Sequence, residues 1–442
     1  MKERKYSLFT AICMITGIVI GSGIFFKADD ILHYTHGNML LGILVFIIAS
    51  IAIVFGSLTI SQLAMRTDRR GGIIAYAEEF INTDIACAFG WFQLFVYFPT
   101  LISIVAEVAS IYLCQLFAIN PSLEIKTCIA ILISIAIFGM NIFSAKFGGY
   151  IQNATMIIKL IPLLVIALLG IVLGNPGEIV QNDMMQFGQT AKSFTWIAAF
   201  APIAFSFDGW TVSTTLSHEI KNSKKNLPIA LTIAPILILF VYIAYYVGIT
   251  SLLGTESVLA HGDSSVYIAA TQLLGSFGAK LVLIFIVISV LGTLNGLALA
   301  YIRMPYTLAS NNMFPFKKVL CKSQDENTNF SVASGVLSLV IMLIWTIFNY
   351  VVKKLDVSAD ISEVSICLSY LTYIILYFTV IRMAKRGEVQ GIWKGYINPI
   401  FAIIGSIIIF SGTLTNPLFE VSMVIFCGIM IVGYFYSKKT SR

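Results

Sequence analysis

Three features of the sequence place glycine or charge inside long apolar runs. The first is the segment Gly17-Ile18-Val19-Ile20-Gly21-Ser22-Gly23-Ile24-Phe25, the second is Phe205-Ser206-Phe207-Asp208-Gly209-Trp210, and the third is Lys159. Each glycine weakens a helix by about 1 kcal/mol, and an aspartate at the centre of a membrane helix costs about 3 kcal/mol on insertion scales. An interrupted helix exposes N–H groups that suit a carboxylate at one end and carbonyl groups that suit an ammonium at the other. Two such breaks facing one pocket would select an α-amino acid zwitterion through the backbone.

Both breaks also admit a structural interpretation. Gly17 and Gly21 have the G-x-x-x-G spacing of a close helix–helix contact. Asp208 could serve as the cap of a second half-helix, a role that is compatible with lining the same cavity. Both alternatives remain open at the level of the sequence.

The composition predicts a membrane protein. The 442 residues are 58% hydrophobic and 11% charged, and the mean hydropathy is +0.90. So little charge cannot cover a water-soluble particle of this size, and a helix crosses the bilayer core with roughly 20 apolar residues. We therefore predict twelve transmembrane helices, near residues 8–26, 39–65, 85–117, 125–143, 150–173, 194–218, 227–253, 276–309, 330–352, 360–383, 397–413 and 417–436.

The loop charges predict the orientation. With the N-terminus inside, 20 of the 28 Lys and Arg residues fall on the cytoplasmic side. Six fall on the opposite side, namely Lys27, Lys126, Lys192, Lys280, Lys353 and Lys354. This bias is the positive-inside rule, so we expect a multi-pass protein of the cell inner (plasma) membrane with both termini cytoplasmic. The longest loops, near 174–193, 254–275 and 310–329, are too short for a soluble domain.

The positions of the breaks predict the organisation of the chain. They lie in the first and sixth spans, as expected of five-plus-five inverted repeats whose interrupted helices meet at the bilayer midplane. We expect an all-α protein with one repeat in 1–173, a second in 194–383, two additional helices in 397–436, and spans 1 and 6 unwound at mid-membrane. No metal-binding, phosphate-binding or nucleophile motif occurs, so we expect neither an enzyme nor a cofactor or metal.

Several stretches resemble the amino acid–polyamine–organocation superfamily, and more narrowly its L-amino acid transporter family with the bacterial serine/threonine and alanine–serine–cysteine exchangers. The stretches are Gly17 to Phe25, Gly71-Gly72 with Tyr76, Glu78 and Glu79, Lys159-Leu160-Ile161-Pro162, Phe205 to Trp210, Glu219 with Lys221-Asn222, and Leu291 to Gly296. They follow the family's order over nearly the whole chain.

The resemblance implies a LeuT-type fold with substrate held between the unwound parts of spans 1 and 6. The substrate carboxylate would meet the N–H groups of Gly21, Ser22 and Gly23 and the Ser22 hydroxyl. The amino group would meet the carbonyl groups of Val19, Phe205 and Asp208, with the Phe205 ring as a lid. Because relatives sometimes carry glycine at the position of Asp208, a role for its side chain does not follow.

Lys159 is the charged residue that bears most directly on whether transport needs sodium. The resemblance suggests that its ammonium occupies the place where sodium-coupled relatives of this fold bind a cation between spans 1 and 8, which makes transport sodium-independent. The alternative is a lysine that snorkels to the interface, although about ten residues separate it from either end of its span.

Most of the other polar residues within spans could have either a functional or a structural role. Tyr242, Ser289 and Asn295 are candidate pocket or gate residues, or else packing residues of the core. Glu107 is a proton-linked group or a buried hydrogen-bonded carboxyl. Arg303 lies near a span end, where we expect it to snorkel.

The leading hypothesis is a sodium-independent antiporter of small neutral L-amino acids, such as alanine, serine, cysteine and threonine, that works by alternating access. The alternatives are a proton-coupled symporter or a carrier of cationic amino acids or polyamines, and, from another class, a channel or receptor. Eukaryotic members of the L-amino acid transporter family pair with a glycoprotein through a disulfide from the loop between spans 3 and 4. Here that loop, 118–124, has no cysteine; Cys114 and Cys128 lie on its flanks. We therefore expect a monomer without an ancillary subunit and without nucleic-acid partners.

Overall fold

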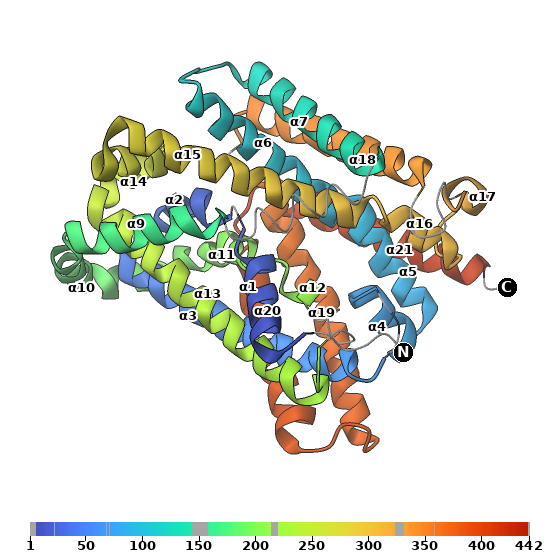
Figure 1. Ribbon diagram of the computed structural model, residues 1–442. Helices are drawn as coiled ribbons and strands as arrows, with labels where there is room; N and C mark the ends of the chain where they lie inside the picture. Colours follow the sequence, from blue (N-terminus) through green and yellow to red (C-terminus); the bar gives the residue numbers. More distant parts are fainter. Residues whose placement is uncertain are drawn as a thin grey trace. The chain divides into compact units, whose positions relative to one another are not determined.

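The computed structural model is helical throughout the part of the chain that it describes (Figure 1). That part comprises residues 6–21, 23–67, 69, 71–143, 158–213, 220–322, 331–357 and 359–440. Within it the one extended pairing is an isolated bridge between Tyr6 and Ile220. The chain forms two compact units, and each unit draws on three separate stretches of sequence.

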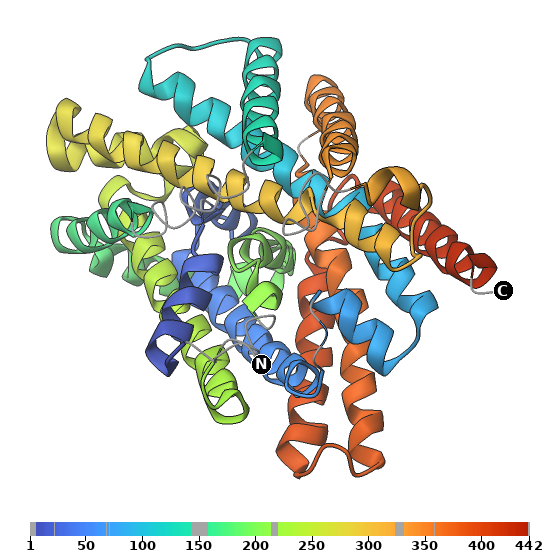
Figure 2. The ribbon, with the colours of Figure 1, turned by 45° about the vertical axis from the view of Figure 1, so that its right-hand side comes forward.

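The first unit comprises Met1–Gly72, Lys159–Phe285 and Ser369–Thr415. Its helices are α1 (Leu8–Val19), η1 (Gly23–Phe26), α2 (Ala28–Tyr34), α3 (Met39–Ala64), α9 (Leu160–Leu173), α10 (Pro176–Lys192), η3 (Thr195–Ala199), α11 (Phe200–Ser206), α12 (Trp210–Ser213), α13 (Ser223–Leu253), α14 (Thr255–His261), η5 (Gly262–Ser264), η6 (Trp393–Ile397) and α20 (Asn398–Ser411). Helix α13 packs against α9, α1 and α3, and α20 also packs against α3 (Figures 1 and 2).

The second unit comprises Ile73–Ile158, Ile286–Leu368 and Asn416–Arg442. Its helices are α4 (Ile73–Phe80), α5 (Thr83–Phe92), the π-helical turn η2 (Gln93–Tyr97), α6 (Phe98–Leu116), α7 (Leu123–Phe143), α16 (Met304–Ser310), α17 (Lys317–Leu320), α18 (Val332–Lys354) and α21 (Phe419–Thr440). Helices α6, α7 and α18 pack against one another, and α5 packs along α21. Two long helices, α15 (Ser265–Tyr301) and α19 (Ile361–Lys385), contribute residues to both units.

The apolar helices account for most of the predicted spans. Ten helical stretches among the described residues are long and apolar enough to cross a bilayer, or eleven if the bent pair α9 and α10 is one span. The stretch Thr195–Ser206 is apolar but short, and described residues of every predicted span lie in a helix. The chain is thus a multi-helical membrane protein, whereas the count of twelve, the repeat boundaries and the depth of the breaks stay predictions.

Two of the predicted loops contain helices. The loop expected at 174–193 contains α10, which is bent by 83° from α9, and the loop expected at 254–275 contains α14, η5 and the start of α15. Within α15 the backbone of Gly275 is non-helical, at φ 69° and ψ 179°, directly before the predicted start of span 8. Hydropathy missed these helices because a short, polar or amphipathic helix outside the apolar core carries no long apolar run.

Helix α10 is fixed against the start of α3 by two long-range hydrogen bonds. The Asp183 carboxylate accepts from the Leu40 N–H at 3.1 Å, and the Asn38 side-chain amide donates to the Asp183 carbonyl at 3.0 Å. The first N–H groups of a helix have no partner within the helix, and a negative charge is favourable at that end. Asp183 therefore caps α3 from a distant part of the sequence.

Replacing Asp183 by alanine should destabilise this contact, because the loss of a helix-capping side chain costs about 1 kcal/mol. We expect the melting temperature of the purified protein to fall by roughly 2 °C or more. Asp183→Asn, which keeps an acceptor oxygen, should lose less. Glu178→Ala on the exposed side of α10 is the control, and equal melting temperatures for Asp183→Ala and this control would contradict the capping role.

Candidate functional site

The first break ends α1 at Val19 and places its free carbonyl groups inside the first unit. Ile20 is extended, at φ −66° and ψ 99°, and its N–H returns to the Thr16 carbonyl at 2.8 Å. A 3₁₀-helix begins at Gly23. A Cβ at Gly23 would lie 3.0 Å from Phe205 Cδ1 and 3.2 Å from Ser206 Cα, so only glycine allows α11 to come this close.

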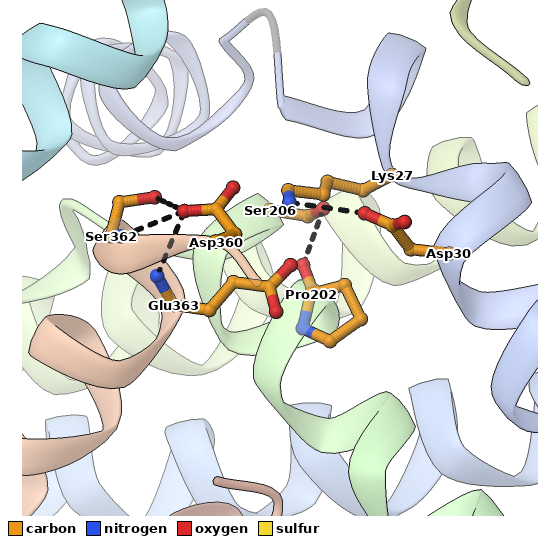
Figure 3. Close-up of polar contacts among 7 residues, drawn as sticks. All are labelled: Lys27, Asp30, Pro202, Ser206, Asp360, Ser362 and Glu363. Atoms are coloured by element: carbon orange, nitrogen blue, oxygen red, sulfur yellow. Dashed lines mark hydrogen bonds and ion pairs between the residues drawn. The ribbon is translucent and has the colours of Figure 1, made fainter. Parts of the chain in front are cut away.

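The second break separates α11 from α12. Helix α11 ends at Ser206, whose hydroxyl donates to the Pro202 carbonyl at 3.0 Å (Figure 3). Asp208 donates its N–H to the Phe205 carbonyl at 3.1 Å, which makes a tight turn. Gly209 follows at φ +94°, a backbone conformation that residues with a side chain rarely adopt.

Tyr242 of α13 joins the two breaks. Its hydroxyl lies 2.8 Å from the Ser206 carbonyl and 3.3 Å from the Val19 carbonyl, the terminal residues of α11 and α1. The ring is fully buried and meets Phe207 edge-on at 5.2 Å between centroids. One phenolic O–H thus serves two helix C-termini that lipid could not hydrate.

Lys159 provides a partner for the last turn of α1 as well. Its ammonium donates to the Gly17 carbonyl, and the residue is 4% exposed. Among the described residues no carboxylate pairs with it. A cation at the C-terminal end of a helix is favoured by the helix dipole, so the buried charge is compensated by the Gly17 carbonyl and by the end of α1.

The ring of Phe205, on α11, is buried against the segment that follows the first break. Its ring meets Phe26 edge-on, with centroids 5.4 Å apart, and the Lys27 ammonium lies 5.3 Å from its centroid. The predicted lid thus contacts Phe26, the last residue of η1, and Lys27, which follows η1.

Asp208 and Trp210 face a cluster of tyrosines on α19. Trp210 meets Tyr373 edge-on at 5.4 Å, and Tyr373 meets Tyr370 at 5.2 Å. The Asp208 carboxylate is close enough to interact electrostatically with both tyrosines. Two tyrosines of α19 therefore lie near an acid of the sixth predicted span.

Three other predicted site residues, Ser22, Ser289 and Asn295, are not among the described first-unit residues that surround the two breaks. Ser22 lies outside the described residues, as does Glu219. Ser289 and Asn295 belong to the second unit. There Asn295 accepts a hydrogen bond from the buried Asn141 side chain at 2.9 Å, and the buried Ser289 hydroxyl has no partner among the described residues.

Glu107 in α6 is a hydrogen-bonded, ion-paired carboxylate of the second unit. Asn349 and Lys353 of α18 each donate to one of its oxygens at 2.6 Å. This arrangement agrees with the second of the two readings of Glu107, a buried carboxyl that joins helices. In the same unit Asp360 accepts from the N–H groups of Ser362 and Glu363 and so caps α19 (Figure 3).

A group of charges beside the first break was not singled out from the sequence. The Lys27 ammonium pairs with Asp30 Oδ2 at 3.1 Å (Figure 3). Asp29 lies near Asp263 of η5 and Tyr245 of α13. The sequence feature that could have indicated this group is the lysine directly after the Gly-Ser-Gly-Ile-Phe-Phe segment, at the end of the first predicted span.

Burial raises the pKa of Asp29 to about 8, with further contributions from Asp30 and Asp263. Asp29 follows the first span and is outside the segments expected in the membrane. Lys27 acts in the opposite direction and lowers this pKa, but burial is the larger effect. Asp29 is thus an acid that the fold holds protonated at neutral pH.

Two interrupted helices, joined through a buried tyrosine and set among apolar spans, are the central feature of this all-helical fold. The crystal structure of MhsT in complex with L-phenylalanine shares this fold. It aligns with 94% of this chain and 100% of its own, with a TM-score of 0.57 and 13% identity. This likeness confirms the predicted fold class.

The chain belongs to the amino acid permease family, whose model matches residues 6–440. It is 26% identical to the serine/threonine exchanger SteT of Bacillus subtilis over 100% of this chain and 98% of that protein. It is 28% identical to the b(0,+)-type amino acid transporter 1 of Mus musculus over 69% of this chain and 62% of that protein. The chain is accordingly a multi-pass amino acid transporter and not an enzyme, and the predicted superfamily is confirmed.

The raised pKa of Asp29 predicts a pH-dependent stability. Between about pH 4 and pH 8 the folded protein binds a proton at Asp29 that the unfolded chain releases, so stability falls as the pH rises through this window. Asp29→Asn keeps the neutral form at every pH. We expect it to melt roughly 2 °C or more above the unsubstituted protein at pH 8.5 and at nearly the same temperature at pH 4.5. A difference of equal size at both pH values would contradict this assignment.

Proposed function

We propose that the protein is a sodium-independent antiporter that exchanges small neutral L-amino acids by alternating access. The observation that carries the proposal is the Lys159 ammonium on the Gly17 carbonyl, at the end of the interrupted first helix. Because the lysine ammonium is a cation that belongs to the protein, transport does not need a sodium ion from solution at this point. The serine/threonine exchanger that aligns over the full length supports both exchange and a small polar substrate.

The substrate would lie between the two breaks of the first unit. We propose that its carboxylate meets the N–H groups of Gly21, Ser22 and Gly23, where η1 begins. Its ammonium would meet the carbonyl groups at the ends of α1 and α11, at Val19, Phe205 and Asp208. The contacts of Tyr242 sharpen this proposal, because a substrate ammonium must share the Val19 carbonyl with that hydroxyl or displace it.

Phe205 is the proposed lid over this pocket. Tyr242 is a proposed gating residue on geometric grounds, since any separation of α1 from α11 must break one of its two contacts. Ser289 and Asn295 stay candidate gating residues of the second unit.

A proton-coupled symporter is the weaker alternative. It requires an acid that is free to exchange protons within a span. Glu107 already accepts from Asn349 and Lys353, and Asp208 has tyrosine neighbours. A carrier of cationic substrates would need one of these same acids at the side-chain end of the pocket.

We also propose that the chain works as a monomer in the plasma membrane, with both termini cytoplasmic and without a disulfide-linked subunit. All seven cysteines are free thiols, and Cys114, beside the 118–124 loop, is buried. Cys128 is exposed on α7, so a non-reducing gel of the protein from its native membrane tests the absence of a linked subunit.

Exchange is tested with the purified protein in proteoliposomes. Radiolabelled L-alanine or L-serine should enter vesicles preloaded with unlabelled amino acid and should hardly enter empty ones. The rate should be the same in sodium and in choline buffers. Uptake into empty vesicles at the preloaded rate would contradict obligatory exchange, and a sodium requirement would contradict the role of Lys159.

Lys159→Ala should lower the exchange rate about tenfold or more, because a hydrogen bond to a charged group contributes about 1.5–3 kcal/mol. Expression and elution as a monodisperse peak should be nearly retained. Lys280→Ala, at an exposed lysine, is the control and should leave exchange unchanged. Loss of folding in Lys159→Ala, with normal exchange by the fraction that folds, would instead assign Lys159 a purely structural role.

A further inference from the structure

Lys27 is a buried lysine that makes none of the proposed contacts to the substrate carboxylate or ammonium. Only 2% of the residue is exposed, although it follows directly on the last residue of η1. A buried ammonium is costly unless other groups compensate it. The groups that compensate it include the Asp30 carboxylate at 3.1 Å and the rings of Phe26 and Phe205, whose centroids lie 5.5 Å and 5.3 Å away.

The ring of Phe205 is held from three directions. The Gly23 backbone is so close that a Cβ there would come within 3.0 Å of the ring. The edge-on contact with Phe26 fixes the tilt of the ring. The Lys27 ammonium lies within the distance at which a cation is attracted to the face of an aromatic ring.

Asp30 in turn fixes the position of the ammonium. The two residues are three positions apart at the start of α2 (Figure 3), and the Asp30 side chain is 42% exposed while that of Lys27 is 3% exposed. The carboxylate can therefore remain hydrated while it holds the cation against the rings. A purely interfacial lysine would instead extend its ammonium into water.

We propose that Lys27 is a positioning residue for the Phe205 lid and that it sets the affinity for the amino acid by holding the ring over the occupied pocket. The proposal rests on the function proposed above, in which Phe205 covers the substrate. Because Lys27 lies on the segment that follows the first break and Phe205 lies on α11, their contact couples the two interrupted helices when the lid closes. On the predicted orientation this coupling is on the external side.

A double-mutant cycle tests the coupling, with the dissociation constant of L-serine measured by competition in detergent and the KM measured in exchange. Lys27→Met keeps the length of the side chain and removes the charge. It should raise both constants about three- to thirtyfold, the range that corresponds to a cation–π contact, with a smaller change in the maximal rate. Lys27→Arg should restore values close to those of the unsubstituted protein.

The second half of the cycle uses Phe205→Leu. This substitution weakens binding by itself, but adding Lys27→Met should then change the dissociation constant less than twofold, since contacting residues are not additive when one acts through the other. Asp30→Asn should give an intermediate loss. Lys192→Met, at an exposed lysine on the end of α10, is the matched control and should have no effect.

Two outcomes would overturn the proposal while leaving transport intact. One is an unchanged KM and dissociation constant in Lys27→Met, including the case in which only the melting temperature falls. The other is an equal loss in the Phe205→Leu background, which would mean that Lys27 acts elsewhere. If Lys27→Met does not fold, Lys27→Gln replaces it in the same cycle. If the unsubstituted protein neither binds nor exchanges any amino acid, it is the proposed function that fails.

Discussion

The first unit depends on how the carbonyl groups at the end of α1 find partners. A helix that stops inside an apolar span leaves its last carbonyl groups without partners, and lipid provides none. Here the Ile20 N–H takes the Thr16 carbonyl, the Lys159 ammonium takes the Gly17 carbonyl, and the Tyr242 hydroxyl lies near the Val19 carbonyl. The helix can therefore end at Val19 only because α9 and α13 bring a cation and a phenol to the same point.

This constraint explains why the proposed substrate site is built from backbone atoms. Once two helices end within one apolar unit, their free N–H and carbonyl groups are the strongest polar features available. The side chains nearby are mostly aromatic, namely Phe25, Phe26, Phe205, Phe207, Tyr242 and Tyr245. In the proposed site these side chains line the pocket, while the backbone provides the charge complementarity that both ends of an amino acid need.

Three buried charged residues follow a common rule. Lys159 meets a carbonyl, Glu107 pairs with Lys353 and Asn349, and Lys27 pairs with Asp30 and two rings. Each charge thus has a polar or charged partner in its own unit, and a buried charge in a medium of low dielectric requires such a partner. Glu107 joins helices α6 and α18. Lys27 and Lys159 instead lie beside the broken helices that form the proposed substrate site.

The sequence by itself determined the membrane class, the helical fold, the approximate position of most spans and the residues at which two helices are interrupted. These features follow from apolar run length and from the low helix propensity of glycine, which are local properties. Local properties could not predict α10, because its contact with α3 depends on Asp183 meeting Leu40 from far along the chain. Nor could they predict that one tyrosine serves both breaks or that Lys27 lies over Phe205. These contacts join different helices, in the case of Tyr242 and Val19 223 positions apart. Only the packing of the helices in three dimensions decides which of many apolar and polar side chains meet there.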